Sequence, residues 1–369
     1  MNPTEILQAR ALPELLRFCG GEPVTAEAWP ARRAELLDLL RRTVYGYSPD
    51  APESVRAEMV ERDDKAFAGK AVQETVRVTF DTPNGPFSFP FTLAVPKTGR
   101  PVPAFLLINF FATLPNRYCP AEELIDNGYA IAQLYYQDVT LDDARGSCGS
   151  VDVSRCFDDG LAACYPRDPH TGWGKIGIWA WAASRVMDVL QTRPELDLSR
   201  IAVVGHSRLG KTALWCAAQD LRFSMAVSND SGCGGASLFR GKKGENIAFM
   251  RIRFPYWFCG NYSDYGDREA ELPADQHFLL ALLAPRGLLV NSSALDAWAD
   301  PDSEFLAVCA AAPAFELLGA SAPVIPPELP GETIALLDGD LAYARRAGTH
   351  YFSRTDWLNI LHYRRLHQI

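Results

Sequence analysis

One segment, residues 200–215, constrains the fold most strongly. Residues 201–204 are a short β-branched run typical of a strand buried on both faces, and residues 211–219 are rich in helix formers. Between them the chain reads G-H-S-R-L-G, which places the second glycine one residue later than the nucleophile elbow G-x-S-x-G does. Such a turn strains its serine and needs small neighbours where strand and helix cross. We therefore predict a nucleophile at Ser207; the alternative is an ordinary turn with a serine N-cap.

Strand and helix patterns alternate along the rest of the chain. Three β runs between residues 55 and 95, interrupted by the hairpin signal Pro83-Asn84-Gly85, are expected to form the antiparallel edge of a mixed sheet. Residues 176–191 carry a helical apolar pattern. Further strands are expected at residues 103–109, 129–135, 223–228, 286–292 and, weakly, 333–337. This alternation predicts an α/β fold, a three-layer αβα sandwich with a mixed, mostly parallel central sheet.

The 369 residues fit one large domain, because no repeat or linker divides them. Residues 1–50 are expected to be a helical cap, with the clearest amphipathic pattern at 35–44. Residues 136–168 are polar and lack periodicity, so we expect a long loop or lid, and loops of this length are usually functional.

Composition excludes several kinds of partner. The net charge is −9 with no run of Lys or Arg, so nucleic acid is not expected. No stretch reaches the ~18 consecutive apolar residues of a membrane span. The nine cysteines are scattered without a C-x-x-C pair, which predicts no metal site, and we expect no cofactor. No secretion signal is visible at the start of the sequence, so we expect a cytoplasmic protein; its oligomeric state stays open.

A serine nucleophile needs a histidine to accept its proton and a carboxylate to orient that histidine. On this type of sheet the chain order is serine, acid, histidine. His350 fits best, because it lies in a loop with Gly348 after the last β-like stretch. His277 lies in an apolar segment, and we interpret it as structural.

Two carboxylates compete for the third role. Asp296 follows the strand near residues 288–292, where the fold usually carries its acid, and Asp230 follows the strand after the nucleophile. We favour Asp296 over Asp230 and place Asp300 third. For the oxyanion we expect two backbone donors, the N–H of Arg208 and an N–H near Phe110 and Phe111 in the loop after Asn109.

The segment G-H-S-R-L-G-K-T-A-L-W resembles the G-C-S-R-x-G-K-x-A-L segment of the glucuronoyl esterases, carbohydrate esterase family 15. The stretches S-N-D-S-G-C-G-G and D-Q-H-F-L-L-A-L-L-A-P-R extend the resemblance over about residues 105–357. It implies the α/β-hydrolase fold and a serine carboxylic-ester hydrolase that cleaves esters of (4-O-methyl-)glucuronic acid in xylan- or lignin-derived material. The partner would be a small-molecule or oligosaccharide ester.

The resemblance also assigns roles to single residues. It implies that the Arg208 guanidinium is a further oxyanion donor, that Lys211 contacts sugar hydroxyls and that Trp298 stacks on the sugar, with Trp257 as a second candidate. Asp230 stands where many fungal members carry glutamate. The family's disulfide joins the residue before the nucleophile to the residue after the histidine, and these positions here are His206 and Tyr351.

Two other functions stay open. An acetyl esterase acting on acetylated xylan-type oligosaccharides would use the same triad, with the sugar in the alcohol part of the ester. A binding protein could keep the hydrolase fold without turnover.

Overall fold

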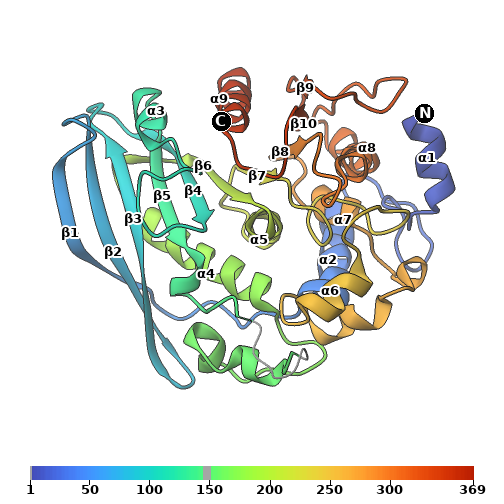
Figure 1. Cartoon of the computed structure of the whole chain (residues 1–369), viewed down its shortest axis with the longest axis horizontal. Helices are drawn as coiled ribbons and strands as arrows, with labels where there is room; N and C mark the ends of the chain where they lie inside the picture. Colours follow the sequence, from blue (N-terminus) through green and yellow to red (C-terminus); the bar gives the residue numbers. More distant parts are fainter. Residues whose placement is uncertain (1, 144–150) are drawn as a thin grey trace.

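A mixed β-sheet runs through the part of the chain that the computed structural model describes, residues 2–143 and 151–369 (Figure 1). The strand order is β1-β2-β3-β5-β4-β6-β7-β8-β10-β9. Neighbours from β5 to β10 pair in parallel, whereas β1, β2, β3 and β9 pair antiparallel at the two edges. The strands are β1 (Arg56–Ala66), β2 (Ala71–Thr82), β3 (Gly85–Pro96), β4 (Val102–Asn109), β5 (Ala130–Tyr135), β6 (Leu196–His206), β7 (Met225–Asn229), β8 (Gly287–Ser293), β9 (Ile334–Leu336) and β10 (Leu341–Arg346).

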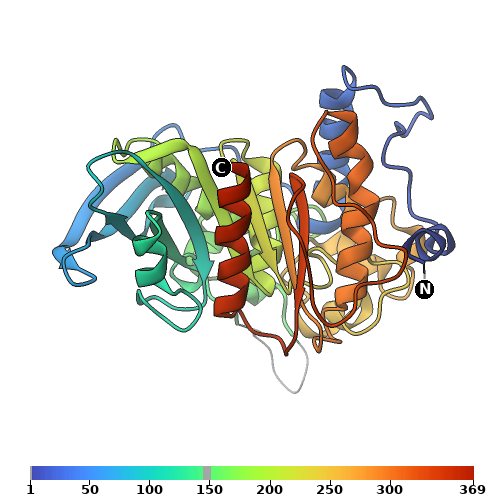
Figure 2. The same cartoon turned by 90° about the horizontal axis from the view of Figure 1, so that it is seen from above.

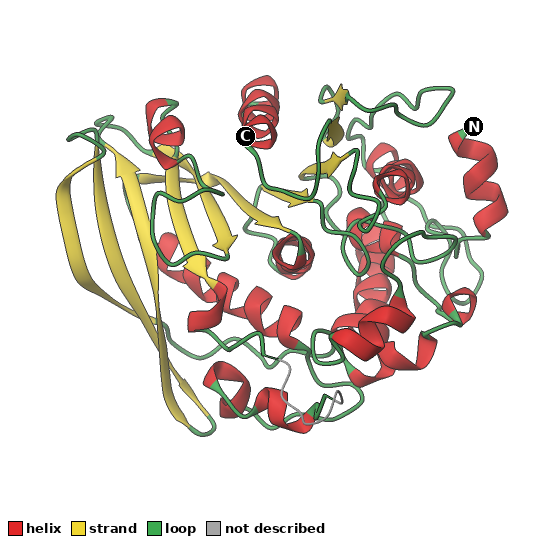
Figure 3. Cartoon of the chain, in the orientation of Figure 1, coloured by secondary structure: helices red, strands yellow, loops and turns green. Residues whose placement is uncertain are grey.

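Helices cover both faces of this sheet (Figures 2 and 3). Successive residues of β4 point to opposite faces: Leu106 and Ile108 pack in a core that includes α4, α5, α7 and α8, whereas Phe105 and Leu107 pack in a second core with α3 and α9. This confirms the predicted three-layer arrangement. The helices are α1 (Pro3–Arg10), α2 (Trp29–Leu40), α3 (Ala121–Asp126), α4 (Lys175–Leu190), α5 (Arg208–Gln219), α6 (Ile247–Arg253), α7 (Gln276–Ala281), α8 (Pro301–Leu317) and α9 (Arg354–His367).

Most predicted elements occur where the patterns placed them. The hairpin between β2 and β3 closes at the pair Thr82–Gly85, so Pro83 and Asn84 form its two-residue turn. Among the described residues 2–50, only α1, α2 and a π-helical turn at Arg41–Tyr45 are helical, so the predicted cap is less regular than expected. The predicted loop at 136–168 contains three short 3₁₀ turns, and its residues 144–150 lie outside the described residues.

The strand β10 is not foreseen from the sequence. It lies parallel to β8, and all six of its residues are buried. It ends in two arginines, which hide the strand pattern, yet both buried side chains are paired: Arg345 donates to the partly exposed Asp302 and Arg346 to the buried Asp356. Because β10 ends four residues before His350, this strand fixes where the histidine loop leaves the sheet.

Among the helices of the described residues, none has the length and apolar character that crossing a bilayer requires.

Candidate active site

Ser207 lies at a strained turn between β6 and α5. Its backbone has φ 57° and ψ −130°, a combination that costs energy for a residue with a side chain. The side chain of Ser207 forms no capping hydrogen bond to α5, and its backbone N–H donates to the carbonyl oxygen of Asn229 at 2.8 Å. An N-cap serine has extended geometry and bonds the helix through its hydroxyl, so the geometry matches a nucleophile elbow and not the ordinary turn.

The two glycines around Ser207 allow this close crossing. A Cβ on Gly205 would lie 1.9 Å from the carbonyl oxygen of Leu209, which no side chain can occupy. A Cβ on Gly210 would lie 3.0 Å from the Cβ of Ser231, so this position is tight but less severe. The later second glycine therefore still serves close packing between α5 and the strands.

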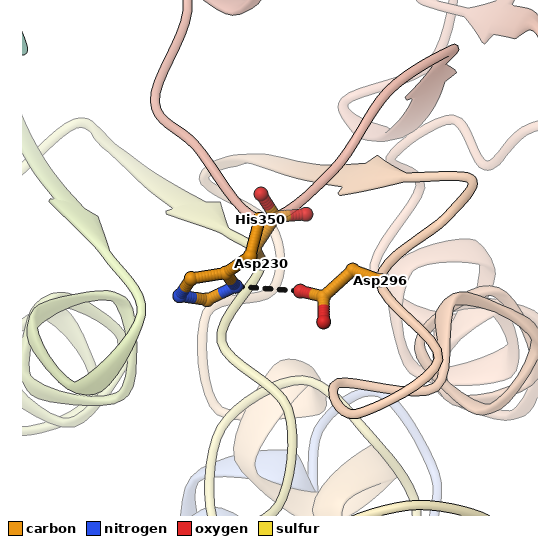
Figure 4. Close-up of side chains that lie close together, drawn as sticks. All are labelled: Asp230, Asp296 and His350. Carbon is orange, nitrogen blue, oxygen red and sulfur yellow. Dashed lines mark hydrogen bonds and ion pairs between the residues drawn. The ribbon is translucent and has the colours of Figure 1, made fainter.

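His350 and Asp296, the predicted base and acid, are hydrogen-bonded to each other. His350 Nδ1 lies 2.6 Å from Asp296 Oδ2 (Figure 4). Their loops are joined by two backbone hydrogen bonds, from Ala294 to Arg346 and from Leu295 to Gly348, both 2.9 Å. Because a carboxylate only accepts, Nδ1 carries the proton and Nε2 is left as the basic nitrogen.

Asp230 lies beside this pair but is bonded elsewhere. Its Oδ2 accepts from the Ser293 hydroxyl at 2.8 Å and from Asn229 Nδ2 at 3.1 Å. Burial, followed by the charges of Glu304 and Asp296, raises the pKa of Asp230 well above its usual value. Burial also raises the pKa of Glu304 to about 7. The geometry therefore favours Asp296 as the partner of His350, with Asp230 held closer to the neutral acid.

In the described part of the chain, Asp230, Asp296 and His350 form the one group of three or more His, Cys, Asp or Glu residues whose possible ligand atoms all lie within 4.8 Å of one another. A metal with nitrogen and oxygen ligands at ~2.0–2.2 Å holds neighbouring ligand atoms more than 3 Å apart. The 2.6 Å between Nδ1 of His350 and Oδ2 of Asp296 is a hydrogen-bond separation. This pair does not fit a metal site.

Arg346 holds the loop that carries His350, residues 347–351, which we call the histidine loop. Its guanidinium donates to the carbonyl oxygens of Ala347, Thr349 and Tyr351 and to the Asp356 carboxylate. These acceptors surround His350 in sequence on both sides. A buried cation with such acceptors fixes the loop conformation.

Aromatic rings pack around the His350 imidazole, beginning with His206 at the turn before Ser207. The ring of His206 lies 4.6 Å from that of His350, and Tyr118 lies 5.1 Å from both His206 and Tyr351. Burial, and next the nearby His350, hold the pKa of His206 well below its usual value. His206 is therefore neutral and does not oppose a positive charge on His350.

The two predicted backbone oxyanion donors differ in availability. As the first residue of α5, Arg208 has an N–H without an intrahelical acceptor. The N–H of Phe110 instead donates to Asn109 Oδ1 at 2.8 Å, inside its own loop. This occupied amide corrects the expectation that Phe110 donates to the oxyanion; its ring lies 5.6 Å from the Arg208 guanidinium.

Trp257 packs against the guanidinium of Arg208. The ring stacks on Phe254 at 3.8 Å and 6°, the Arg208 guanidinium lies 4.5 Å from the ring centroid, and Nε1 donates to Asp142 at 2.8 Å. Trp257 is 3% exposed, so it has no free face to offer a sugar, which corrects that expectation. Trp298, by contrast, is 47% exposed, contacts Phe249 edge to face at 4.6 Å, and lies two residues from Asp296.

Lys211, on α5 four residues after Ser207, is buried and paired. Its Nζ donates to the carbonyl oxygen of Ser231 at 2.6 Å and to Glu245 Oε1 at 3.0 Å, and the same Glu245 oxygen accepts from the N–H of Cys233. Lys211 thus ties the Asp230 loop to the segment at 245, and its contact with a sugar stays a prediction.

Comparisons with known proteins agree with this geometry. The family model "Glucuronyl esterase, fungi" matches residues 78–319. Carbohydrate esterase MZ0003, from an unknown prokaryotic organism, is 32% identical over 94% of this chain and 87% of its own length. The chain belongs to the glucuronoyl esterases of carbohydrate esterase family 15. It is a carboxylic-ester hydrolase of the α/β-hydrolase fold.

Two further relatives are a bacterial structure and a fungal enzyme. The glucuronoyl esterase of Solibacter usitatus has a TM-score of 0.85 and 32% identity, covering 96% of this chain and 97% of that one. The 4-O-methyl-glucuronoyl methylesterase 1 of Phanerochaete chrysosporium is 28% identical over 84% of this chain, and the match spans 62% of its own length.

Three residues of this glucuronoyl esterase site escaped sequence reasoning. Asp142 pairs with Arg208, Glu245 with Lys211, and Arg346 holds the histidine loop. Asp142 and Glu245 lie in irregular segments, where no period distinguishes them from other acids. Only Arg346 had a sequence signal: it lies four residues before His350, at the start of the glycine-containing loop that carries this histidine.

Proposed function

We propose that this protein hydrolyses esters of glucuronic acid, with Ser207, His350 and Asp296 as its catalytic triad. The observation that carries the proposal is the 2.6 Å hydrogen bond between His350 and Asp296. The loop of His350 is hydrogen-bonded to the loop of Asp296, and the His350 ring contacts His206, the residue before Ser207. Fungal relatives named 4-O-methyl-glucuronoyl methylesterases support the substrate class.

In the proposed mechanism the Ser207 Oγ attacks the ester carbonyl carbon while Nε2 of His350 takes its proton. Asp296 stabilises the resulting imidazolium through Nδ1–H. The oxyanion is held by the backbone N–H of Arg208 and by its guanidinium. The C–O bond to the alcohol then breaks, and His350 returns the proton to the leaving oxygen. Water, deprotonated by His350, hydrolyses the acyl-enzyme and releases the uronic acid.

The half-exposed Trp298 is the proposed sugar platform, because an aromatic face two residues from the triad acid can cover the apolar face of a pyranose. The buried Lys211–Glu245 pair forms part of the proposed wall behind the sugar. We further propose that the natural esters come from xylan- or lignin-derived material. The cytoplasmic location stays a prediction.

The test is hydrolysis of benzyl and methyl glucuronate beside an acetylated xylo-oligosaccharide. Ser207→Ala should abolish cleavage of the glucuronate esters. Ser199→Ala, which removes an exposed hydroxyl at the start of β6, is the matched control and should act like wild type. Cleavage of the acetyl ester alone would select the acetyl esterase, and wild type inactive on every ester would favour a binding protein.

A further inference from the structure

Asp142 is a buried carboxylate that the triad does not use. Its side chain is 1% exposed and accepts from four side chains. Oδ2 accepts from the Arg208 guanidinium and from the Tyr136 hydroxyl at 3.2 Å, and Oδ1 accepts from Trp257 Nε1 at 2.8 Å and the Tyr256 hydroxyl at 3.3 Å. Burial, and then the Asp142 charge, raise the pKa of both tyrosines, so they stay donors. So many donors on one buried carboxylate point to an anion held in one orientation.

The partner of this anion is the residue next to the nucleophile. Asp142 binds Nη1 of Arg208, and the Trp257 ring lies under the guanidinium at 4.5 Å. The Arg208 Nε is buried without a partner, and within the described ranges 2–143 and 151–369 no acceptor is found for Nη2. The side chain is 28% exposed. The guanidinium is therefore fixed through Nη1 by Asp142, and its Nη2 group is left to donate toward the exposed side of the residue.

The segment that carries Asp142 is itself anchored to the body of the fold. Two residues before Asp142, the Thr140 hydroxyl donates to Asp159 at 2.6 Å, and the Thr140 carbonyl accepts from Trp179 of α4 at 3.2 Å. The carbonyl oxygen of Val139 accepts from the N–H of Leu161 at 2.8 Å. Asp142 thus reaches Arg208 from a segment whose preceding residues are anchored to the body of the fold.

We propose that Asp142 is a positioning residue that holds the Arg208 guanidinium toward the reacting carbonyl, so that its open edge donates to the oxyanion. This inference rests on the proposed esterase function. An arginine on an exposed helix start would sample many rotamers, and each would have to be lost in the transition state. The salt bridge, the ring beneath it and the two tyrosines remove that freedom before substrate binds.

A double-mutant cycle with Asp142→Asn and Arg208→Ala tests this, read as kcat, KM and Tm on whichever ester wild type cleaves. We expect Arg208→Ala to lower kcat about 100-fold and Asp142→Asn about 10- to 100-fold, with KM changed by less than about threefold. The double variant should fall no further than about twofold below Arg208→Ala. Asp158→Asn, an exposed carboxylate of the same predicted loop, should match wild type.

Losses that multiply in the double variant would overturn the proposal, as would an Asp142→Asn enzyme with a lower Tm but wild-type kcat. If Asp142→Asn does not fold, Arg208→Lys decides: lysine keeps the charge but cannot bind Asp142 and the carbonyl with one planar group, so kcat should fall with KM unchanged. A wild-type kcat in Arg208→Lys would refute the proposal. Wild type inactive on every ester would instead remove the proposed function.

Discussion

Replacing Asp296 by asparagine tests the triad most directly. When His350 takes the serine proton, a positive imidazolium forms beside the Asp296 carboxylate, whose Oδ2 lies 2.6 Å from Nδ1. For charge centres ~4 Å apart, an effective dielectric of ~20 gives about 4 kcal/mol. The His350 side chain is 41% exposed, so we discount this to roughly 3 kcal/mol, a factor of about 10² in kcat.

A second effect of Asp296→Asn acts in the same direction. The new amide can donate to Nδ1 of His350 and so move the ring proton to Nε2, the nitrogen that must accept from Ser207. In the serine-protease triad this substitution costs about 10⁴ in kcat, so we expect a loss between about 10² and 10⁴.

Asp230→Asn is the matched control for this experiment. Because its surroundings raise the pKa of Asp230, an uncharged amide of the same size should replace it with less than about a threefold change in kcat. The assay is kcat and KM on benzyl glucuronate, with Tm by circular dichroism. Activity of Asp296→Asn within tenfold of wild type, or a larger loss in Asp230→Asn at unchanged Tm, would refute this assignment of the acid.

Three further predictions concern packing, pH and substrate. In urea unfolding, Gly205→Ala should destabilise the protein by more than about 3 kcal/mol and Gly210→Ala by about 1–3 kcal/mol, because a Cβ on Gly205 would meet the Leu209 carbonyl oxygen. Equal losses in the two variants would contradict the close crossing of β6 and α5 at Gly205. Burial lowers the pKa of His277 to about 4, so as the pH falls the unfolded chain takes up this proton before the folded chain does, and the free energy of unfolding should fall by about 3 kcal/mol from pH 6.5 to 4. His277→Gln should flatten this dependence of the unfolding free energy on pH, and an unchanged dependence would exclude His277 as its cause. Trp298→Ala should raise KM for glucuronate esters about tenfold with kcat nearly kept, and an unchanged KM would exclude the sugar platform.

The regular parts of the fold could be predicted because their signals are local. Residues 201–204 and the glycines around Ser207 carry the strand, the turn and the helix within sixteen residues, and the structure has β6 and α5 there. The strand β10 failed because its two arginines are polar in sequence, and their burial depends on partners at Asp302 and Asp356. Long-range pairing of buried charges leaves no period in the chain.

The site residues divide by the same rule. His350 and Asp296 could be proposed from chain order and from the strands they follow, and their contact is what the structure adds. Trp257 carried a plausible residue type, but whether an aromatic face is free depends on the tertiary packing, and here the ring is buried and stacked on Phe254. The partner of Asp142 is Arg208, which lies 66 residues away in the sequence, and no local pattern reveals this pairing.

Ring packing links the elbow to the histidine loop where the family's disulfide would stand. His206 and Tyr351 occupy the two cysteine positions, and Tyr118 touches both rings at 5.1 Å, while His206 also contacts His350. Aromatic pairs contribute about 0.5–1.5 kcal/mol each, so three together approach the 2–4 kcal/mol typical of a disulfide. The neutral His206 also places an uncharged ring against the imidazole that becomes positive in the proposed mechanism. The same packing therefore positions His350 and leaves its charge to Asp296, and neither task depends on the redox state of the surroundings.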